Sequence, residues 1–176
     1  MNIESKLKGV IRDIPNFPKD GIIFKDISPI MQNPNISNDV LDHLTKLYEN
    51  KDIDAIAGIE SRGFLFGYSL AMRLNVPFIL IRKKGKLPYD KISVSYSLEY
   101  GEATIEMHTD AIKEGMKVLI HDDLLATGGS ALAASELIKK SGGEIFGFNF
   151  LISLDFLKGR EKLALVSDNI INLVNY

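Results

Sequence analysis

The sequence predicts an α/β domain with an open, mainly parallel, twisted sheet and helices on both of its faces. Short, continuously apolar runs alternate with segments of helical periodicity, which is typical of strands that are buried on both faces of a parallel sheet. A chain of 176 residues can bury a substantial core as one domain. The sequence contains no internal repeat, low-complexity tract or linker. We therefore expect residues 1–176 to form a single domain.

The N-terminal part has the least regular pattern. Apolar residues at helical spacing predict a helix over residues 2–13, which Pro15 and Pro18 would end. Residues 21–30 are expected to be extended or irregular. Ser37 is a plausible N-cap of a second helix. The apolar face of that helix comprises Val40, Leu41, Leu44, Leu47 and Tyr48.

Strands and helices alternate in the rest of the chain. Strands are expected at residues 55–59, 76–81, 118–120 and 145–152. Helices are expected at about residues 64–74 and 131–140. Two further segments, residues 92–100 and 103–107, alternate in polarity on either side of Gly101-Glu102 and indicate a hairpin insertion.

Composition excludes several classes of function. The chain has no cysteine, which excludes disulfides, thiolate metal sites and cysteine nucleophiles. Its net charge of −2 gives no overall attraction for nucleic acid. No apolar run approaches the roughly 18 residues needed to span a bilayer, and no signal-peptide pattern begins the sequence. We therefore expect a cytoplasmic protein that binds neither membranes nor nucleic acid.

Residues 118–130, with the sequence VLIHDDLLATGGS, are the most informative segment. Asp122 and Asp123 follow an apolar strand, and a glycine-containing loop at residues 126–130 precedes a helix. Backbone N–H groups and the helix dipole favour an anion there, while carboxylates accept hydrogen bonds from a diol. This combination predicts a site for a ribose phosphate. The acid pair alone is less specific, because adjacent aspartates also occur in the metal sites of phosphatases.

Two other loops are expected beside this one. In open parallel sheets, ligands bind beyond the carboxyl ends of the strands, where residues 60–63, 82–86 and 122–130 would all lie. The first loop contains an arginine and the second is strongly basic. The P-loop and dinucleotide-binding glycine patterns are both missing from the sequence. A single ligand with two separate anionic groups would explain all three loops.

The segment at residues 118–130 closely resembles the phosphoribosyl-diphosphate signature of the type I phosphoribosyltransferases. Five more segments narrow the resemblance to the adenine phosphoribosyltransferase family, and they occur in that family's order. They are GIIFKDISP (21–29), SRGFLFG (61–67), IRKKGKLP (81–88), SYSLEYG (95–101) and LKGREKL (157–163). The resemblance implies the type I phosphoribosyltransferase fold. It also implies a small N-terminal hood at about residues 1–34 and a flexible catalytic loop and hairpin at about residues 86–107.

The same resemblance implies a reaction. Members of this family transfer a phosphoribosyl group from phosphoribosyl diphosphate to adenine, giving AMP and pyrophosphate, with Mg²⁺ as the cofactor, in purine salvage. We therefore expect adenine and phosphoribosyl diphosphate as substrates and a homodimer as the assembly. Transfer to another base, such as xanthine, hypoxanthine or orotate, is one alternative. A non-catalytic sensor of phosphoribosyl diphosphate that binds nucleic acid is another, although neither the length nor the net charge supplies a DNA-binding domain or a broad basic face.

The family's motifs also imply the donor-binding residues. Asp122 and Asp123 would hold the ribose hydroxyls, directly or through the metal. The 5-phosphate would be bound by Ala126, Thr127, Gly128, Gly129 and Ser130. The pyrophosphate loop would be Ser61, Arg62 and Gly63, with a cis peptide bond before Ser61. Lys83 and Lys86 of the basic segment would also bind the donor. One basic residue of the segment 82–86 would reach the neighbouring subunit's site, and which of Arg82, Lys83, Lys84 and Lys86 does so stays open. The alternative for Asp122 and Asp123 is a solvated acid pair, and the alternative for residues 126–130 is an ordinary turn into a helix. Arg62 and the basic segment could instead be surface charges.

Glu99, Arg62 and Tyr100 are the expected catalytic residues. The segment around Glu99 resembles the family's mobile loop, which brings Ser95, Tyr96, Glu99 and Tyr100 inward over the site. Adenine loses a ring proton as its nitrogen bonds to the anomeric carbon, and the Glu99 carboxylate could accept or relay that proton. The alternative for Glu99 is an exposed hairpin glutamate.

Adenine is expected to contact Ile23, Phe24, Lys25 and Leu157. Backbone groups of Ile23 and Lys25 resemble those that read the Watson–Crick edge of adenine. Phe24 and Leu157 would sandwich the ring, or simply fill the core.

Two positions depart from the family pattern. His121 stands where an apolar residue is usual, and Ser130 stands where threonine is usual. Ser130 retains a hydroxyl. His121 is expected to be an interior histidine with its hydrogen bonds satisfied, rather than a catalytic one. The sequence has no histidine cluster with metal-ligand spacing. Mg²⁺ would therefore be held mainly by ligand oxygens and water, with Asp122 or Asp123 as the candidate protein ligands.

Overall fold

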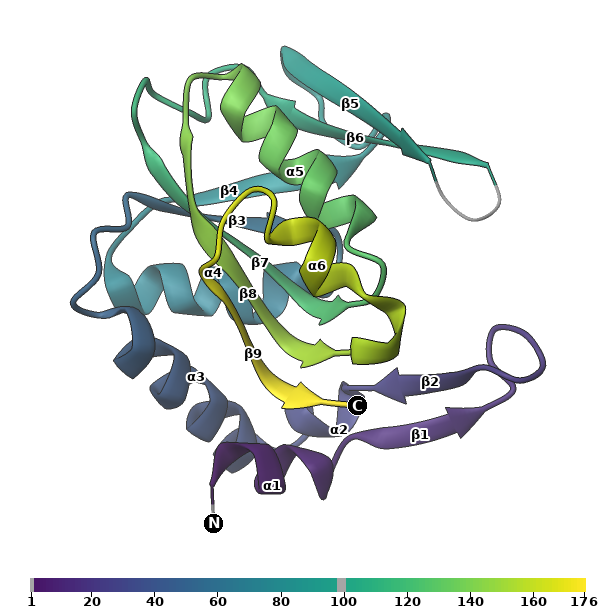
Figure 1. The fold of residues 1–176 in the computed structure, drawn as a ribbon. Coiled ribbons are helices and arrows are strands. Elements are labelled where there is room, and N and C mark those ends of the chain that lie inside the picture. Colours follow the sequence, from purple (N-terminus) through teal and green to yellow (C-terminus); the bar gives the residue numbers. More distant parts are fainter. Residues whose placement is uncertain (1, 98–100) are drawn as a thin grey trace. The chain divides into compact units, whose positions relative to one another are not determined.

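The structure is a computed structural model that describes residues 2–97 and 101–176 (Figure 1). The chain forms two compact units, residues 1–47 and residues 48–176. Among the described residues, no helix is long and apolar enough to cross a membrane.

The N-terminal unit begins with a short helix and a two-stranded ribbon. Helix α1 (Ile3–Lys8) is followed by strand β1 (Arg12–Pro15), which pairs antiparallel with β2 (Ile23–Asp26). The prediction of one helix over residues 2–13 is therefore wrong in its second half. Pairing with β2, a segment distant in sequence, outweighs the helical spacing of the apolar residues there.

Helix α3 (Pro34–Tyr48) begins three residues before the predicted cap. The side chain of Asn33 accepts hydrogen bonds from two backbone N–H groups of the first turn, at 3.1 and 3.3 Å. Ser37 is not the N-cap, so that prediction is wrong. Its hydroxyl instead donates a hydrogen bond of 2.8 Å to the carbonyl of Ile30, which lies in the preceding helix α2 (Ser28–Met31).

The larger unit is built on a seven-stranded sheet. Its strands are β3 (Ala55–Ile59), β4 (Phe78–Lys83), β5 (Lys91–Ser97), β6 (Glu102–His108), β7 (Lys117–Leu125), β8 (Glu144–Ser153) and β9 (Ile170–Asn175). Their order across the sheet is β5-β6-β4-β3-β7-β8-β9. Neighbouring strands from β4 to β9 are parallel, whereas the hairpin of β5 and β6 adds an antiparallel edge. The mainly parallel sheet and the hairpin insertion are therefore confirmed.

Helices cover both faces of this sheet. In Figure 1, α4 (Gly63–Leu74) lies behind the sheet, and α5 (Gly129–Lys140) and α6 (Gly159–Leu163) lie in front of it. A short 3-10 helix (Asp155–Leu157) precedes α6. Helices on both faces explain why the central strands need apolar side chains in both directions.

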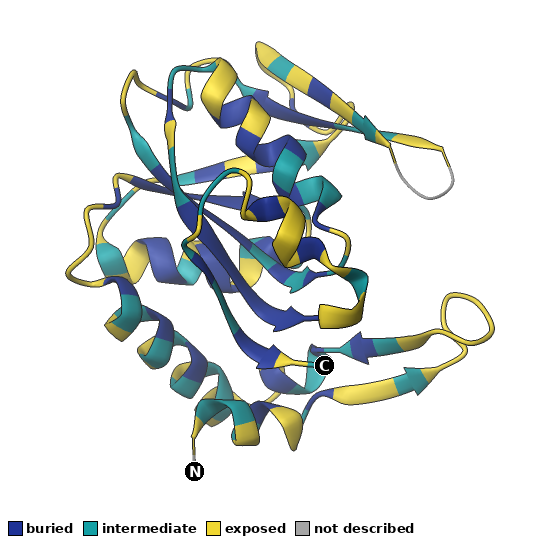
Figure 2. Cartoon of the chain, viewed as in Figure 1, coloured by how far each residue is buried: buried dark blue, intermediate teal, exposed yellow. Residues whose placement is uncertain are grey.

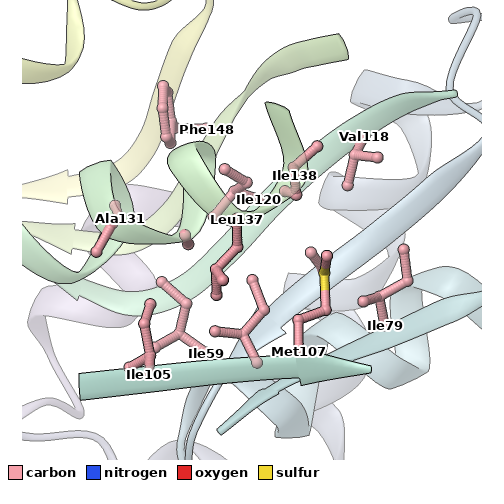
Figure 3. Packing of buried hydrophobic residues seen from close by; sticks show 14 of the residues in the cluster. Ile59, Ile79, Ile105, Met107, Val118, Ile120, Ala131, Leu137, Ile138 and Phe148 are labelled. Atoms are coloured by element: carbon pink, nitrogen blue, oxygen red, sulfur yellow. The ribbon is translucent and has the colours of Figure 1, made fainter. Parts of the chain in front are cut away.

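The core between α5 and the sheet accounts for the apolar runs of the sequence. Val118, Ile120 and Phe148 on the strands, with Leu137 and Ile138 on α5, are fully buried and pack together (Figure 3). Burying side chains of this size stabilises the fold by about 1.5–3 kcal/mol each. Figure 2 shows the central strands in dark blue, whereas β5 is largely exposed. The edge hairpin can therefore alternate in polarity while the central strands cannot.

One strand is longer than predicted, and one strand was not predicted. Strand β7 continues to Leu125, so that Asp122 and Asp123 lie inside the strand rather than after it. Strand β9 was not predicted, because asparagines interrupt its apolar residues. Parallel pairing with β8 is what extends this segment.

Candidate active site

The order of the strands places two segments side by side at the carboxyl ends of the central strands. From β3 the chain passes through α4 to β4 on one side, whereas β7 pairs with β3 on the other side. Residues 60–63 follow β3, and the acid pair lies near the end of the adjacent β7. Such a switch in strand order is where open α/β sheets bind their ligands.

The acid pair is enclosed by the beginning of α4. Asp123 is 5% exposed, and its backbone N–H donates a hydrogen bond of 2.9 Å to Oδ1 of Asp122. A Cβ atom at Gly63 would lie 2.8 Å from the carbonyl oxygen of His121 and 2.9 Å from Oδ1 of Asp122. Helix α4 can approach the strand this closely only with glycine at that position, which explains the glycine in this loop.

Arg62 joins the loop after β3 to the acid pair. Its Nε lies 2.8 Å from Oδ2 of Asp123, and 35% of the arginine side chain remains exposed. Arg62 is therefore more than a surface charge, because it is paired to a buried carboxylate while remaining accessible. Oδ2 of Asp123 has no aligned hydrogen-bond donor among the described residues. The peptide bond between Glu60 and Ser61 is cis, as the family resemblance implied.

Burial changes the titration of both acids. Burial, followed by the charge of Asp123, raises the pKa of Asp122 well above its usual value. Burial also raises the pKa of Asp123, although the Arg62 charge opposes that rise. The pair therefore retains a proton more readily than isolated aspartates do. A ligand that donates hydrogen bonds or carries positive charge would favour the ionised form.

The glycine-rich loop at residues 126–130 lines a small cavity. Helix α5 begins at Gly129, and Gly128 before it has φ of +76°, a conformation that favours glycine. The cavity has a volume of about 90 Å³, and Tyr96 and Asp122 also line it. The first N–H groups of a helix lack partners within the helix and, with the helix dipole, attract anions. The predicted phosphate loop and one member of the acid pair thus share a cavity.

Helix α6 supports this loop through a glycine. A Cβ atom at Gly159 would clash with the carbonyl oxygen of Ala126 and would lie 3.0 Å from the backbone nitrogen of Gly128. The backbone N–H of Leu154 also donates a hydrogen bond of 2.9 Å to the carbonyl of Leu125. The segment before and within α6 is therefore packed against the loop at residues 126–130. The sequence analysis did not predict this contact, and only the glycine within LKGREKL could have indicated it.

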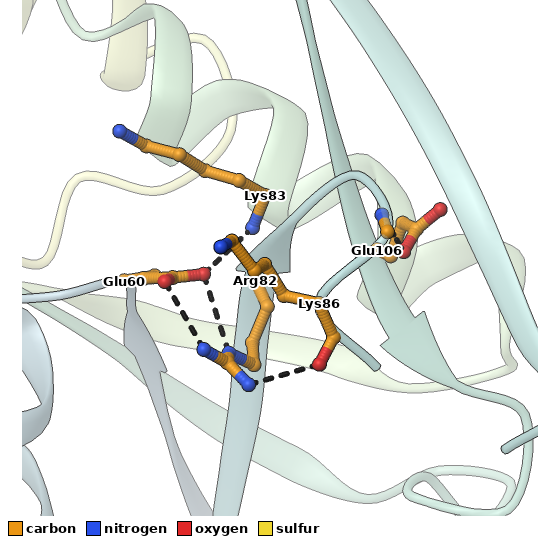
Figure 4. A network of polar contacts seen from close by, with 6 residues as sticks. Glu60, Arg82, Lys83, Lys86 and Glu106 are labelled. Atoms are coloured by element: carbon orange, nitrogen blue, oxygen red, sulfur yellow. Dashed lines mark hydrogen bonds and ion pairs between the residues drawn. The ribbon is translucent and has the colours of Figure 1, made fainter. Parts of the chain in front are cut away.

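A polar network orders the basic segment (Figure 4). Arg82 binds both carboxylate oxygens of Glu60, with N–O distances of 3.2 and 3.1 Å, and donates a hydrogen bond of 2.9 Å to the carbonyl of Lys86. The backbone N–H of Lys83 donates a hydrogen bond of 3.0 Å to the same glutamate. Glu106 accepts a backbone hydrogen bond of 2.9 Å from the turn. The backbone of this segment is therefore held from two sides.

This network gives the basic residues different roles. The Arg82 guanidinium is engaged by Glu60, whereas the side chain of Lys83 points away from the network in Figure 4. Burial raises the pKa of Glu60, but hydrogen bonds from Arg82 and from the Lys83 N–H outweigh it and lower the pKa below its usual value. Sequence reasoning missed Glu60 and Arg82 as a pair. Their proximity follows from the register of β3 and β4, which sets Ile59 beside Ile81.

His121 is an interior residue, as expected. It is fully buried, and its Nδ1 lies 2.7 Å from Oδ1 of Asn149. Its Nε2 has no hydrogen-bond partner among the described residues, so only one of the two ring nitrogens is hydrogen-bonded. Burial lowers the pKa of His121 to about 4, which keeps the ring neutral at neutral pH.

The residues expected to contact adenine occur in both units. Ile23, Phe24 and Lys25 lie on β2, where Nζ of Lys25 forms an ion pair of 2.7 Å with Asp13. Leu157 is the last residue of the 3-10 helix in the larger unit. Their assignment to adenine stays a prediction.

Two of the expected catalytic residues, Glu99 and Tyr100, lie outside the described residues. The strand before them is described and carries Ser95 and Tyr96. The hydroxyl of Tyr96 lies 2.9 Å from the hydroxyl of Ser130. Among the described hairpin residues, Tyr96 therefore contacts the loop at residues 126–130.

Comparison with known sequences identifies the family. Residues 26–173 match the family described as the phosphoribosyl transferase domain. The adenine phosphoribosyltransferase of Cytophaga hutchinsonii is 53% identical over 174 residues, which cover 99% of this chain and 96% of that protein. The adenine phosphoribosyltransferase of Halothermothrix orenii is 56% identical over 158 residues, which cover 90% of this chain and 93% of that protein.

Solved structures agree with the sequence comparison. The Giardia lamblia enzyme complexed with 9-deazaadenine matches with a TM-score of 0.93 and 37% identity, covering 100% of this chain and 98% of that chain. The Saccharomyces cerevisiae enzyme, complexed with an imino-altritol bisphosphate and adenine, matches with a TM-score of 0.90 and 42% identity. The match covers 97% of this chain and 98% of that chain. The chain therefore belongs to the phosphoribosyltransferase family and, within it, to the adenine phosphoribosyltransferases.

Proposed function

We propose that this protein transfers the 5-phosphoribosyl group of phosphoribosyl diphosphate to adenine, producing AMP and pyrophosphate in purine salvage. The observation that carries the proposal is the ion pair between Arg62 and Asp123. It joins an arginine-containing loop to an acid pair, and the other member of that pair, Asp122, lines the cavity of residues 126–130. Sites for two anionic groups thus flank a site for a diol, which is the order of the groups in phosphoribosyl diphosphate. Two related enzymes have been solved in complexes that contain adenine or 9-deazaadenine.

The donor sugar would lie between the two anion sites. Its 5-phosphate would accept hydrogen bonds from the N–H groups at the start of α5 and from the hydroxyls of Thr127 and Ser130. In the described part of the chain, Oδ2 of Asp123 contacts Nε of Arg62 at 2.8 Å but has no aligned hydrogen-bond donor, so it is suited to accept a hydrogen bond from a ribose hydroxyl. The carboxylates would also favour the positive charge that develops at the anomeric carbon as pyrophosphate leaves.

Pyrophosphate would be held by residues 61–63 and by a lysine of the basic segment. Lys83 is the better candidate, because the Glu60–Arg82 network fixes its backbone and leaves its side chain pointing away (Figure 4). Arg62 would stabilise the charge of the leaving group while it remains close to Asp123.

The acceptor base would be adenine. Ile23, Phe24, Lys25 and Leu157 are the proposed contacts, on the basis of the family resemblance. Glu99, supported by Tyr100, would accept or relay the proton that adenine loses as its nitrogen bonds to the sugar.

Magnesium is the proposed cofactor. The carboxylates of Asp122 and Asp123 are oxygen donors of the kind that Mg²⁺ prefers. Among the described residues, however, no three acidic or histidine side chains gather into a metal site. The residues therefore fit an ion held mainly by oxygens of the donor and water, with one of these aspartates as a protein contact. When bound, the ion would neutralise charge on the pyrophosphate.

A homodimer is the proposed assembly. The exposed face formed by α4 and β4 carries an apolar hollow of about 550 Å³. Leu65 is 44% exposed and Tyr68 is 54% exposed, which is costly for apolar groups unless a partner covers them. Strand β4 continues directly into the basic segment, so a second copy on this face would bring that segment toward the neighbouring site. The hollow is lined by Phe64, Leu65, Tyr68, Phe78 and Leu80.

A single incubation tests the proposed activity. The protein is mixed with adenine, phosphoribosyl diphosphate and Mg²⁺, and AMP is measured by chromatography. Adenine is expected to be consumed far faster than hypoxanthine, xanthine or orotate in competition. Equal consumption of another base, or the absence of AMP, would contradict the proposal. Sedimentation of the wild type and of a Leu65→Glu variant tests the dimer, since the variant is expected to be monomeric.

A cytoplasmic location is also proposed, because the donor substrate is a highly charged metabolite that does not cross membranes unaided. Cell fractionation with an antibody against the protein tests it. Recovery in an exported fraction would contradict the location without bearing on the reaction.

A further inference from the structure

A tyrosine of the hairpin forms part of the wall of the phosphate cavity. The hydroxyl of Tyr96, on β5, lies 2.9 Å from Oγ of Ser130, in the first turn of α5. The ring of Tyr96 also lies beside the loop, since a Cβ atom at Gly129 would be 3.4 Å from its Cδ2. All three residues line the same cavity of about 90 Å³. Two segments that are distant in sequence therefore meet at this cavity.

We propose that Tyr96 is a positioning residue for the phosphate-monoester group of the ligand. In this role it holds the Ser130 hydroxyl in the orientation that donates to a phosphate oxygen. The inference rests on the proposed function, because it deepens the assignment of residues 126–130 to the 5-phosphate.

The chemistry of the two hydroxyls supports this role. A serine hydroxyl has one proton to donate and two lone pairs that accept. If the Tyr96 hydroxyl donates to Ser130, the serine proton is left for the phosphate. A hydrogen bond that Ser130 accepts also polarises its own O–H group, which strengthens the bond that it donates to an anion. The geometry allows either hydroxyl to be the donor. A phosphate dianion in the cavity would favour donation from Tyr96 to Ser130, because the Ser130 proton is then left for the anion.

Packing supports the same role. Tyr96 is half-buried and packs against the apolar core, so its ring has a defined position. An aromatic wall beside the loop excludes water from one side of the cavity. Hydrogen bonds from the helix N-terminus to an anion are stronger where water is excluded. The tyrosine would therefore contribute both its hydroxyl and its ring.

The test separates the phosphate from the rest of the ligand. Dissociation constants for AMP and for adenosine are measured by calorimetry with the wild type, Tyr96→Phe, Ser130→Ala and the double variant. Tyr96→Phe is expected to weaken AMP binding by roughly fivefold to tenfold, the effect of one hydrogen bond, and to leave adenosine binding unchanged. In the double variant, the Tyr96 change should add nothing to the Ser130 change. Ser130→Thr, which retains the hydroxyl, should keep the sensitivity to Tyr96→Phe.

Thr45→Val is the control, because it removes a hydroxyl on α3 that donates to the carbonyl of Leu41 outside the cavity, so this variant is expected to bind AMP as the wild type does. Unchanged or tighter AMP binding by Tyr96→Phe would overturn the inference, and tighter binding would mean that the tyrosine competes with the phosphate. An equal loss for AMP and adenosine would also overturn it. Failure of the wild type to synthesise AMP would instead contradict the proposed function, which these binding measurements do not require.

Discussion

Nε of Arg62 lies 2.8 Å from Oδ2 of Asp123, so one guanidinium connects the loop after β3 with the buried end of β7. A buried carboxylate without a partner is costly, and this arginine compensates it before any ligand binds. The arginine side chain is still 35% exposed, so the same cation can also face an anionic ligand. The ion pair therefore belongs both to the fold and to the site.

Removal of this cation should affect catalysis strongly. Arg62→Ala leaves Asp123 buried without its counterion and removes the proposed donor to the pyrophosphate. We expect kcat/KM for phosphoribosyl diphosphate to fall by about 30-fold or more, since loss of one partner of a buried charge pair costs about 2–5 kcal/mol. Steady-state kinetics measure this change. Arg73→Ala, at the opposite end of α4, is the matched control and should behave as the wild type. Wild-type kinetics in Arg62→Ala would remove the arginine from the mechanism.

Substitution of the acid tests the diol assignment separately. Asp123→Asn keeps the size of the side chain, but it loses the negative charge and leaves Arg62 facing a neutral amide. We expect kcat/KM for the donor to fall at least tenfold, because hydrogen bonds to a charged group are worth about 1.5–3 kcal/mol. The control is Asp110→Asn, which changes an exposed acid in the turn after β6. If Asp123→Asn and Asp110→Asn had equal kinetics, Asp123 would not hold the sugar.

A methyl group at position 159 should disturb the phosphate loop from outside the cavity. In Gly159→Ala the new Cβ would clash with the carbonyl of Ala126, so the loop has to move. We expect KM for phosphoribosyl diphosphate to rise about tenfold and stability to fall by about 1–3 kcal/mol, as for other overpacked sites. Kinetics and urea unfolding measure the two effects. Gly9→Ala is the control, because its Cβ would meet no atom closer than 3.5 Å.

Features encoded by neighbouring residues were predictable from the sequence, and features made by distant residues were not. The buried strands and the loop at residues 126–130 are local patterns, and the structure confirms where they lie. The pair formed by Glu60 and Arg82 depends on the register of two strands, and the contact between Gly159 and Ala126 depends on the packing of α6. No spacing within one segment encodes either contact.

The N-terminal error has the same origin. The apolar residues between positions 2 and 13 fit a helix by spacing, but pairing of β1 with β2 decides the conformation of the second half. The position of Ser37 was misjudged for a more local reason, because Asn33 and Pro34 supply a stronger start for α3.

The buried histidine should make stability depend on pH in a defined window. The pKa of His121 is about 4 in the folded protein and 6.5 for an exposed histidine. Above pH 6.5 the ring is neutral in both states. Between these values the unfolded chain binds a proton that the folded chain does not, so stability falls as the pH falls. The loss from this group reaches at most about 3 kcal/mol near pH 4, at about 1.36 kcal/mol per unit of pKa difference.

Urea unfolding of the ligand-free protein at several pH values between 7 and 4 measures this loss. His121→Leu should be less stable at pH 7, because Oδ1 of Asn149 loses its hydrogen-bond partner, but its stability should fall less steeply toward pH 4. The double variant His121→Leu/Asn149→Leu removes both partners, so it should regain stability at pH 7 and keep the shallower pH dependence. Because the two effects separate, a pH dependence in His121→Leu as steep as in the wild type would show that other groups cause it.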